Sequence, residues 1–444
     1  MKLNNKKHSS KKNPSYKSTM HFLASRVFFS TLLCIFLTST PAHSGLFDWL
    51  FGKSGTKQEE ALQENVQIET TPENDTSWTD EKVEYLTRYT KLRDWVAPDF
   101  QNQTQALGYD EKTFETPENL KAQVNFWLAI YTKYSTTQGV LHDPTNLEKV
   151  YAVIDFKDIN SDESQDRYQK ERARKKHIED KKNEIAEKES IDVSKIRFQL
   201  GQSDRTKEAL FFSGRYRAEM EAIFEEAGLP KELVRMVYVE SSFNVLARSK
   251  VGASGLWQIM PRTSRPYRML KSSVDLRNSP LDATKVSAKI LRMNYNILGK
   301  WPLAITAYNH GANGIKRLTE RYETTSLPEL IEKVSSSPNF GFASRNFYAC
   351  FLAMLEVEKN ALKYFPTLRW SEPFESETVK LTEPLRYRDL LKLFDEDEEK
   401  LQVFNPHLLA STKKAFGVIE SGVSVLLPKG KSIEKLLGPQ LKKK

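Results

Sequence analysis

The sequence predicts a mainly α-helical protein with a small α+β module near its C-terminal end. Residues 196–366 divide into successive segments of helical periodicity, separated by Gly, Pro and Ser residues that end or begin helices. Residues 374–432 instead alternate short β-type runs with short helical ones. With 444 residues and 39% hydrophobic content, the chain is long enough for two or three globular domains.

The N-terminal 44 residues have the three parts of a secretory signal peptide. Seven Lys and Arg residues precede or flank an apolar run, 27–37, and small residues surround a cleavage site after Ser44. The run is too short to cross a bilayer comfortably, and an uncleaved membrane anchor is the alternative. Removal of residues 1–44 lowers the formal net charge from +9 to +2. The basic composition is therefore no evidence for a nucleic-acid partner.

Residues 45–78 are predicted to be a disordered linker because they are largely polar and acidic. The aromatic start of this linker, 45–51, either contacts an outer-membrane or wall surface or is a loose terminus.

Residues 79–160 are predicted to form a mainly helical accessory region. Residues 124–131 indicate a packed helix, and residues 150–154 are either a helix or a strand. Residues 161–204 alternate Lys and Arg with Glu, which predicts a charged helical connector.

Residues 205–366 are predicted to be an all-helical domain. Gly228-Leu229-Pro230 ends one helix, and Ser279 caps another that has Pro280 in its first turn. The expected helices cover about 208–227, 231–240, 280–298, 301–309, 313–321, 327–334 and 343–363.

The module at 374–432 is predicted to begin and end with β-strands, near 379–381 and 423–428, with two short helices between them. Residues 433–444 form a basic tail that is expected to be solvated.

Glu240 is a carboxylic acid at a position that should face the core. Leu233, Met236, Val237 and Glu240 share one stripe of the helix expected at 231–240. A charge in such a place is costly unless it is paired or used. Burial and the nearby helix C-terminus both favour the protonated form, which a general acid requires. Half of a salt bridge or a frayed helix end is the plainer interpretation.

Three further segments follow Glu240. Residues 249–261 combine Ser249 and two glycines with Trp257 and Gln258, which together provide close backbone approach, an aromatic face and an amide for a sugar. Residues 301–311 place Tyr308 and Asn309 at a helix end before a glycine turn. Residues 340–348 end in Tyr348. Each aromatic side chain has an alternative place in the core.

These motifs resemble those of the family 1 lytic transglycosylases, which cleave peptidoglycan with a goose-lysozyme-like helical domain. The matching residues are Glu240-Ser241, Gly255-Leu256-Trp257-Gln258 and Ala307-Tyr308-Asn309. The sequence looks most similar to the membrane-bound lytic transglycosylase D branch. One departure is that Ser344 precedes Tyr348 by four residues, where the family often has Glu.

The resemblance implies a lysozyme-like catalytic domain over 205–366 and specific roles for the matching residues. Glu240 would be the acid and base that cuts the bond between N-acetylmuramic acid and N-acetylglucosamine. Tyr308 would hydrogen-bond to Glu240 and orient it. Five other residues would contact the glycan: Ser249, Trp257, Gln258, Asn309 and Tyr348. The module at 374–432 loosely resembles a LysM sugar-binding module, and a structural cap is the alternative.

The expected partner is therefore a peptidoglycan glycan strand in the periplasm or cell envelope, acted on by a monomer without a cofactor. No HExxH motif or ligand-spaced His pair predicts a metal site. Asp275 and Glu320 could serve as a second carboxylate by position only, and salt bridges are the favoured explanation for both. A non-catalytic peptidoglycan-binding scaffold and a hydrolytic lysozyme are the alternative functions.

Overall fold

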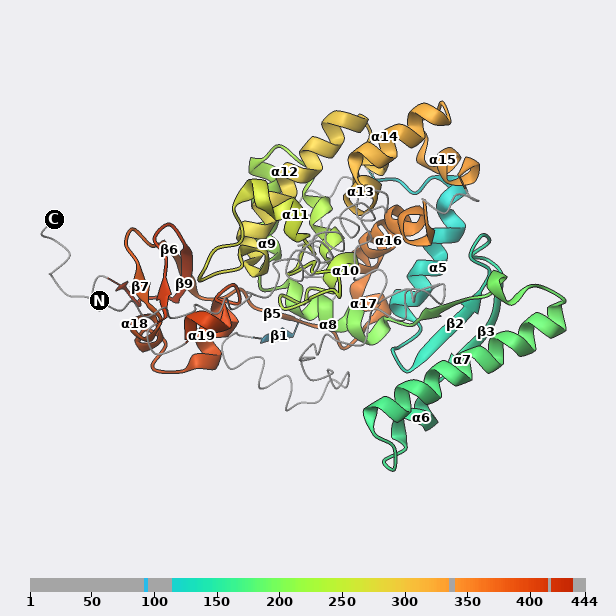
Figure 1. Cartoon of the computed structure of the whole chain (residues 1–444), viewed down its shortest axis with the longest axis horizontal. Helices are drawn as coiled ribbons and strands as arrows, with labels where there is room; N and C mark the ends of the chain where they lie inside the picture. Colours follow the sequence, from blue (N-terminus) through green and yellow to red (C-terminus); the bar gives the residue numbers. More distant parts are fainter. Residues whose placement is uncertain (1–91, 95–113, 335–339, 414–416, 434–444) are drawn as a thin grey trace, which may run out of the picture. The chain divides into compact units, whose positions relative to one another are not determined.

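The structure is a computed structural model that describes residues 92–94, 114–334, 340–413 and 417–433. The predicted signal peptide, the predicted linker at 45–78 and the tail from residue 434 onward lie outside these residues. The protein is mainly helical, as the sequence predicted (Figure 1). Across the described ranges, no helix is both long enough and apolar enough to cross a membrane.

A three-stranded antiparallel sheet with order β3-β2-β4 lies in the N-terminal part of the described chain. The side chains of β2 alternate between two cores, since Val140 belongs to the main core and Leu141 to a smaller one beneath helix α7. This part contains α5 (Lys121–Thr132), β2 (Gln138–His142), β3 (Val150–Asp155), α6 (Lys157–Ser161), α7 (Arg167–Glu189), η3 (Val193–Lys195) and β4 (Arg197–Leu200).

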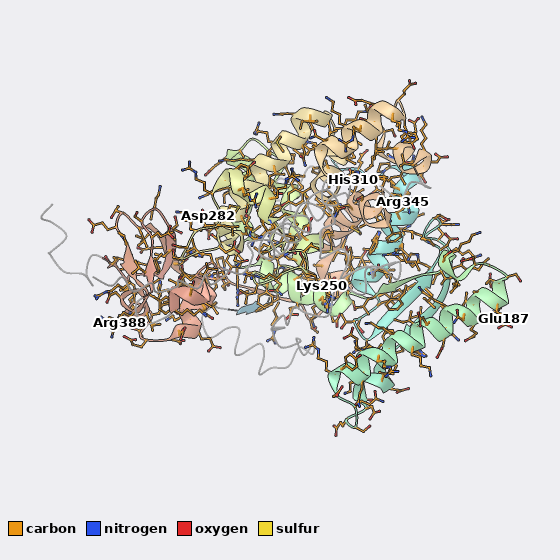
Figure 2. All side chains as sticks on the ribbon, viewed as in Figure 1. Glu187, Lys250, Asp282, His310, Arg345 and Arg388 are labelled. Carbon is orange, nitrogen blue, oxygen red and sulfur yellow. The ribbon has the colours of Figure 1, made fainter. Side chains whose placement is uncertain are left out.

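Two expectations for this part need correction. The region predicted as mainly helical contains the packed helix α5, but residues 150–155 form a strand of the sheet. The predicted connector is helical in α7, yet Ile185 of α7 is buried against that sheet. The outer face of α7 carries charged side chains such as Glu187 (Figure 2). The charge pattern thus identified the solvent face of a packed helix.

The central region consists of helices, as expected from their caps and stop signals. The structural elements are α8 (Ser203–Ser213), α9 (Arg217–Glu226), η4 (Lys231–Arg235), α10 (Met236–Ser241), α11 (Pro261–Ser264), η5 (Arg265–Tyr267), η6 (Leu276–Asn278), α12 (Pro280–Leu298), α13 (Trp301–His310), α14 (Ala312–Arg321), α15 (Leu327–Lys333), α16 (Phe342–Lys359) and α17 (Ala361–Tyr364). Ser279 caps α12 by accepting a hydrogen bond from the backbone N–H of Asp282.

The helix predicted over 208–227 is divided into α8 and α9. Gly214 lies between them, and a Cβ atom there would come within 2.0 Å of the carbonyl oxygen of Ser371. Ser371 ends strand β5 (Arg369–Ser371), which pairs with β1 (Leu92–Asp94). The break therefore follows from a close tertiary contact.

The C-terminal module has the predicted strands and helices. Strand β6 pairs with β9 in antiparallel register, and a shorter pair joins β7 to β8. Its elements are β6 (Ser376–Lys380), β7 (Leu385–Arg386), α18 (Tyr387–Lys392), α19 (Glu398–Phe404), η7 (Ala410–Lys413), β8 (Val418–Ile419) and β9 (Ser424–Pro428). The buried residues of this module and those of the central helices belong to one continuous hydrophobic core.

Candidate active site

Glu240 is the next-to-last residue of α10, a short helix that continues directly from η4. All six residues of α10 are buried. The helix ends because Ser242 and Phe243 both have positive φ, 51° and 56°. Two consecutive non-glycine residues in this conformation are costly, so the surrounding packing must hold them there. Phe243 is itself buried, with its ring 4.7 Å from that of Tyr238.

The carboxyl group of Glu240 is in an environment that keeps it protonated. The residue is 1% exposed, and its Oε2 has no hydrogen-bond partner among the described residues. Burial alone raises the pKa of Glu240 from its usual 4.5 to about 8. A group with this pKa holds its proton at neutral pH and can also lose it, which suits a residue that acts first as an acid and then as a base.

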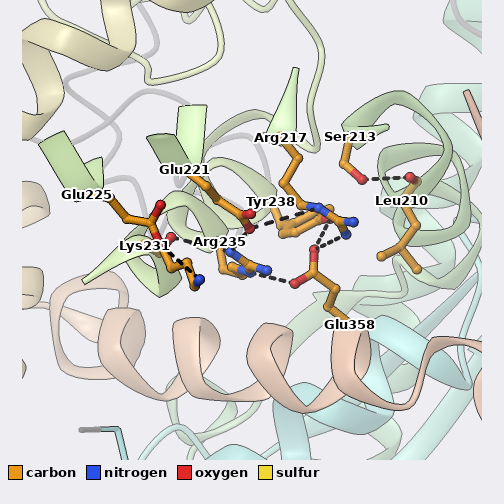
Figure 3. A network of polar contacts seen from close by, with 9 residues as sticks. All are labelled: Leu210, Ser213, Arg217, Glu221, Glu225, Lys231, Arg235, Tyr238 and Glu358. Carbon is orange, nitrogen blue, oxygen red and sulfur yellow. Dashed lines mark hydrogen bonds and ion pairs between the residues drawn. The ribbon is translucent and has the colours of Figure 1, made fainter. Parts of the chain in front are cut away.

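A buried network of charges lies next to α10 and gives another carboxyl group the opposite state (Figure 3). Glu358 on α16 accepts hydrogen bonds from Arg217 (3.0 Å) and from the hydroxyl of Tyr238 (2.7 Å). Arg235 bridges Glu358 to Glu221. Burial alone would raise the pKa of Glu358, but Arg235 and Arg217 lower it to about 2. The network ties α9 and α16 to η4 and α10, the segment that carries Glu240.

Tyr308 lies close to Glu240 but does not hydrogen-bond to it. Burial raises the pKa of the Tyr308 hydroxyl, and the nearby charge of Glu240 raises it further. The hydroxyl donates to the carbonyl oxygen of Trp257 (2.9 Å) and is 3.0 Å from the hydroxyl of Ser287. The expected hydrogen bond to Glu240 is therefore wrong for this structure, because the proton of the Tyr308 hydroxyl is already donated elsewhere.

Trp257 does not offer its ring to a ligand. The residue is fully buried, and its ring stacks on Phe224 at a centroid distance of 5.6 Å. Its indole N–H donates to the hydroxyl of Thr284. The predicted sugar-stacking role is thus wrong, and the alternative place in the core is confirmed. Its contribution to the site is its backbone carbonyl group, which holds Tyr308.

Ser249 and Gln258 shape the loop that follows α10. The hydroxyl of Ser249 accepts a hydrogen bond from the backbone N–H of Ala253 (2.9 Å). The amide of Gln258 donates to the carbonyl oxygens of Ala247 and Gly255. Its Oε1 is buried and has no hydrogen-bond partner in the described part of the chain. An acceptor of this kind is ready to receive an N–H or O–H of a ligand.

Arg277 supports this loop through hydrogen bonds to its backbone. Its guanidinium donates to the carbonyl oxygens of Gly252 (2.7 Å) and Ile259 (3.1 Å), and Asp275 fixes it with a salt bridge of 2.8 Å. The sequence pattern did not single out Arg277. Gly255 packs directly on the backbone of Arg277, where a Cβ atom would be only 1.8 Å from the carbonyl oxygen.

Asn309 and Tyr348 are placed where they support helices. Oδ1 of Asn309 accepts a hydrogen bond from Ser344 (2.8 Å) and so links α13 to α16. Asn309 is 5% exposed and Tyr348 is 2% exposed, with its ring stacked near Phe351. Neither side chain is presented to a glycan here, contrary to the predicted contacts.

The two candidate second carboxylates form ion pairs. Asp275 pairs with Arg277, and Glu320 pairs with Lys316 on the surface of α14. No cluster of three or more potential metal ligands was found in the described ranges. Of the three acids, Glu240 is therefore the one that is buried without an ion-pair partner among the described residues.

A known protein family matches the segment that contains Glu240. The family model described as Transglycosylase SLT domain matches residues 220–329. Over these residues the chain is similar to transglycosylase SLT domains, and we refer to this matched part as the SLT domain. The matched segment of this domain includes Glu240, the loop with Gln258, and Tyr308, whereas Tyr348 lies beyond it.

Curated relatives match a larger share of the chain than this family model does. Membrane-bound lytic murein transglycosylase D of Escherichia coli (strain K12) is 28% identical over 205 residues, which is 44% of this chain and 42% of the relative. The same protein of Escherichia coli O6:H1 (strain CFT073) gives the same values. The chain spans less than half the length of these relatives.

Two solved structures are similar over a smaller part of the chain. Lytic transglycosylase Slt from Pseudomonas aeruginosa is 22% identical, with 34% of this chain and 25% of that chain covered and a TM-score of 0.28. The 70 kDa soluble lytic transglycosylase from Escherichia coli is 20% identical, with 32% and 24% covered and a TM-score of 0.26.

Proposed function

We propose that this protein is a peptidoglycan lytic transglycosylase in which Glu240 is both the general acid and the general base. The observation that carries the proposal is the state of Glu240, whose buried carboxyl group lacks a counter-charge and has a pKa of about 8. The SLT domain and the relatives named as lytic murein transglycosylases support the same activity.

The reaction needs a single carboxyl group if water is not a reactant. Protonated Glu240 donates its proton to the oxygen that links N-acetylmuramic acid to N-acetylglucosamine, and the C1–O bond breaks. The N-acetyl group stabilises the electron-poor C1. Ionised Glu240 then takes the proton of the C6 hydroxyl while O6 bonds to C1. The product is a 1,6-anhydro sugar, and Glu240 regains its proton.

The surrounding residues prepare this acid. The charge network with Glu358 holds η4 and α10, the helical segment that carries Glu240. Tyr308 lies near enough to Glu240 that an ionised Glu240 raises the pKa of its hydroxyl. We propose that Tyr308 packs against Glu240 and orients it, and that Oε1 of Gln258 and the hydroxyl of Ser249 bind the glycan. Because Glu240 is 1% exposed, glycan binding has to uncover its carboxyl group.

Hydrolysis is less well supported than transglycosylation. A hydrolase of the ordinary two-carboxylate kind needs a second carboxylate to activate water or attack C1. Asp275 and Glu320, the two candidates, are already in ion pairs. The two reactions differ in product mass, because hydrolysis adds one water molecule and the anhydro product has none.

The decisive experiment is digestion of purified sacculi by the wild-type protein and by Glu240→Gln, with mass spectrometry of the products. Anhydro products from the wild type and a loss of turnover by at least about 1,000-fold in the variant are expected, since Gln cannot donate a proton. Glu320→Gln is the matched control and should keep full activity, because Glu320 is an exposed residue of α14. Retained turnover in Glu240→Gln would refute the assignment.

The proposed place of action is the periplasm or cell envelope, with export by the N-terminal signal peptide. A relative named as membrane-bound supports an envelope location. The C-terminal module is proposed to bind glycan in the manner of LysM modules. Its contacts with the SLT domain also fit the alternative of a structural cap.

A further inference from the structure

A cavity of about 580 Å³ lies apart from Glu240 and has no role in the proposed reaction. Its walls come from two parts of the chain: residues 265–272, which follow α11, and Glu420 of the C-terminal module. The lining residues are Arg265, Arg268, Leu270, Lys271, Ser272 and Glu420. A volume of this size is in the range of small-ligand sites.

The cavity has an excess of positive charge. No described residue forms an ion pair within 4 Å or a side-chain hydrogen bond with Arg265, Arg268 or Lys271, although Lys271 lies near enough to Glu420 to help lower its pKa. Glu420 is the one acidic residue of the lining, and its Oε1 already accepts hydrogen bonds from Ser272 and from the backbone N–H of Ser273 (3.2 Å). The lining has three positively charged side chains and one carboxylate, so its net charge is +2. Such a site favours an anion.

The two arginines are brought together by an unfavourable backbone conformation. Arg268 follows η5 with φ of +51°, and its backbone N–H donates to the carbonyl oxygen of Arg265 (3.1 Å). A non-glycine residue in this region costs energy, and such residues are often found at functional sites. The turn places both guanidinium-bearing residues at one cavity, next to Lys271.

The chemistry of the lining favours a short acidic peptide over a phosphate polymer. Leu270 is 45% exposed and provides an apolar wall for aliphatic side chains. The carboxylate of Glu420 can accept a further hydrogen bond from a peptide N–H or an ammonium group. A polyphosphate would bring further negative charge against Glu420 without a group for this acceptor.

Hydrogen bonds link the segment that lines the cavity to the loop of the candidate active site. Lys271 and Leu270 belong to the hairpin-like segment that pairs with Val274 and Asp275. Asp275 fixes Arg277, which holds the carbonyl oxygens of Gly252 and Ile259 in the loop of Gln258. A ligand in the cavity would thus be bound by the same scaffold that supports the glycan-binding loop.

We propose that this basic cavity binds the free carboxylates of peptidoglycan stem peptides, and so selects glycan that carries such stems. The inference rests on the proposed function for the nature of the polymer. Guanidinium–carboxylate pairs are strong and directional, and the ligand is expected to use Arg265 and Arg268 in this way. Lys271 adds a third positive charge.

The test compares Arg265→Gln/Arg268→Gln/Lys271→Gln with a control triple variant, Lys289→Gln/Arg292→Gln/Arg317→Gln. The control removes the same charge from exposed positions of α12 and α14. Calorimetric titration uses three probes: a synthetic stem tetrapeptide with free carboxylates, the same peptide fully amidated, and inorganic phosphate.

The wild type and the control should bind the free tetrapeptide, and the cavity variant should bind it at least about tenfold more weakly. The amidated peptide should bind the wild type as weakly as the free peptide binds the cavity variant. Equal binding of the free peptide by both triple variants would overturn the proposal. Tighter binding of phosphate than of the tetrapeptide would overturn it in favour of a phosphate-bearing ligand.

A cleavage assay separates this inference from the proposed function. The cavity variant should show a raised KM on stem-bearing glycan and an unchanged KM on glycan from which the stems have been removed. Peptide binding is measured without turnover, so a wild-type protein that binds the tetrapeptide but does not cleave glycan refutes the function alone. Normal cleavage with no effect of the cavity variant on either substrate refutes the cavity proposal alone.

Discussion

Glu240 and Glu358 are both almost fully buried, yet their environments hold them in opposite protonation states. Glu358 has two arginines and a tyrosine hydroxyl around it, and its pKa is about 2. Glu240 forms no ion pair in the described part of the structure, and its pKa is about 8. Burial opposes ionisation in both cases, so the presence of arginine decides the difference. This contrast separates a structural carboxylate from a candidate acid without reference to any relative.

Glu240 should make the folded protein less stable as the pH rises. A carboxyl group with a folded pKa of about 8 and an unfolded pKa near 4.5 binds more protons in the folded state between these values. The free energy of unfolding therefore falls with pH, by on the order of 3 kcal/mol at pH 7. Glu240→Gln removes this cost, so its thermal midpoint should exceed that of the wild type at pH 8 and approach it at pH 4. Equal midpoints at all pH values would contradict the burial of a titrating Glu240.

Glu358 should contribute stability of the opposite sign. Its lowered pKa gives stability above the unfolded pKa near 4.5, and this stability is lost as the pH falls toward 2. Glu358→Gln leaves Arg235 and Arg217 buried without their common partner and should reduce the free energy of unfolding at pH 7 by about 3–5 kcal/mol. Urea denaturation measures the change, with the exposed Glu320→Gln expected within about 0.5 kcal/mol of the wild type. A similar small change in Glu358→Gln would show that the network is not formed.

At the scale of elements, the loop between α10 and α11 depends on contacts with η6. Arg277 holds the loop through two carbonyl oxygens, and the hydroxyl of Ser254 donates to Oδ1 of Asn278 (2.7 Å). Gln258 has a φ of +44°, so part of this support maintains an unfavourable backbone conformation. The position of the free Oε1 of Gln258 is therefore set by residues that need not touch a glycan.

Gly255→Ala should disrupt this loop. The new Cβ would approach the carbonyl oxygen of Arg277 to 1.8 Å at a residue with φ of +78°, so the loop must move. We expect a stability loss on the order of 3 kcal/mol and a loss of cleavage even where the protein remains folded. Gly341→Ala is the matched control, because Gly341 has φ of −68° and nothing within 4 Å of a Cβ atom. Circular dichroism and product release from sacculi measure the two effects, and normal cleavage by Gly255→Ala would exclude a role for this loop geometry.

The sequence predicted helices well where local signals act and failed where distant contacts decide. The start of α12 followed from Ser279 and Pro280 as cap and first turn. The break at Gly214 did not, because it depends on the approach of Ser371, which is distant in the sequence. The same limit applies to Trp257, since an aromatic residue in a Gly-rich segment has one sequence signature whether it faces a ligand or the core.

The buried charge network was missed although a signal for it was present. Glu358 comes three residues after the strongly apolar run 347–355, so it is as misplaced as Glu240 on a helix that is almost entirely buried. Arg235 likewise lies within an apolar segment, and Arg217 and Glu221 are one helical turn apart. Only the three-dimensional arrangement shows which misplaced acid receives the arginines, so the sequence could nominate Glu240 but could not exclude Glu358.

At the scale of the whole molecule, the C-terminal module contacts the segment that precedes Arg277. The carbonyl oxygen of Ser273 accepts hydrogen bonds from the backbone N–H of Leu409 (3.0 Å) and the hydroxyl of Thr412 (2.7 Å). The backbone N–H of Asp275 donates to the carbonyl oxygen of His407 (2.9 Å). Asp275 fixes Arg277, and Arg277 holds the loop of Gln258. The module therefore stabilises the residues that support this loop, and it should unfold together with the SLT domain.

Thr412→Val tests this coupling at a buried residue of nearly the same shape. The change removes the hydroxyl donor to Ser273 and should lower the free energy of unfolding by about 1–2 kcal/mol, because the buried carbonyl oxygen loses one of its two partners. Scanning calorimetry should show one transition that covers both parts of the protein and shifts to lower temperature as a unit. Ser411→Ala, an exposed neighbour, should leave the transition unchanged. Two separate transitions in the wild type, or a shift confined to one of them, would mean that the module is attached to the SLT domain without supporting it.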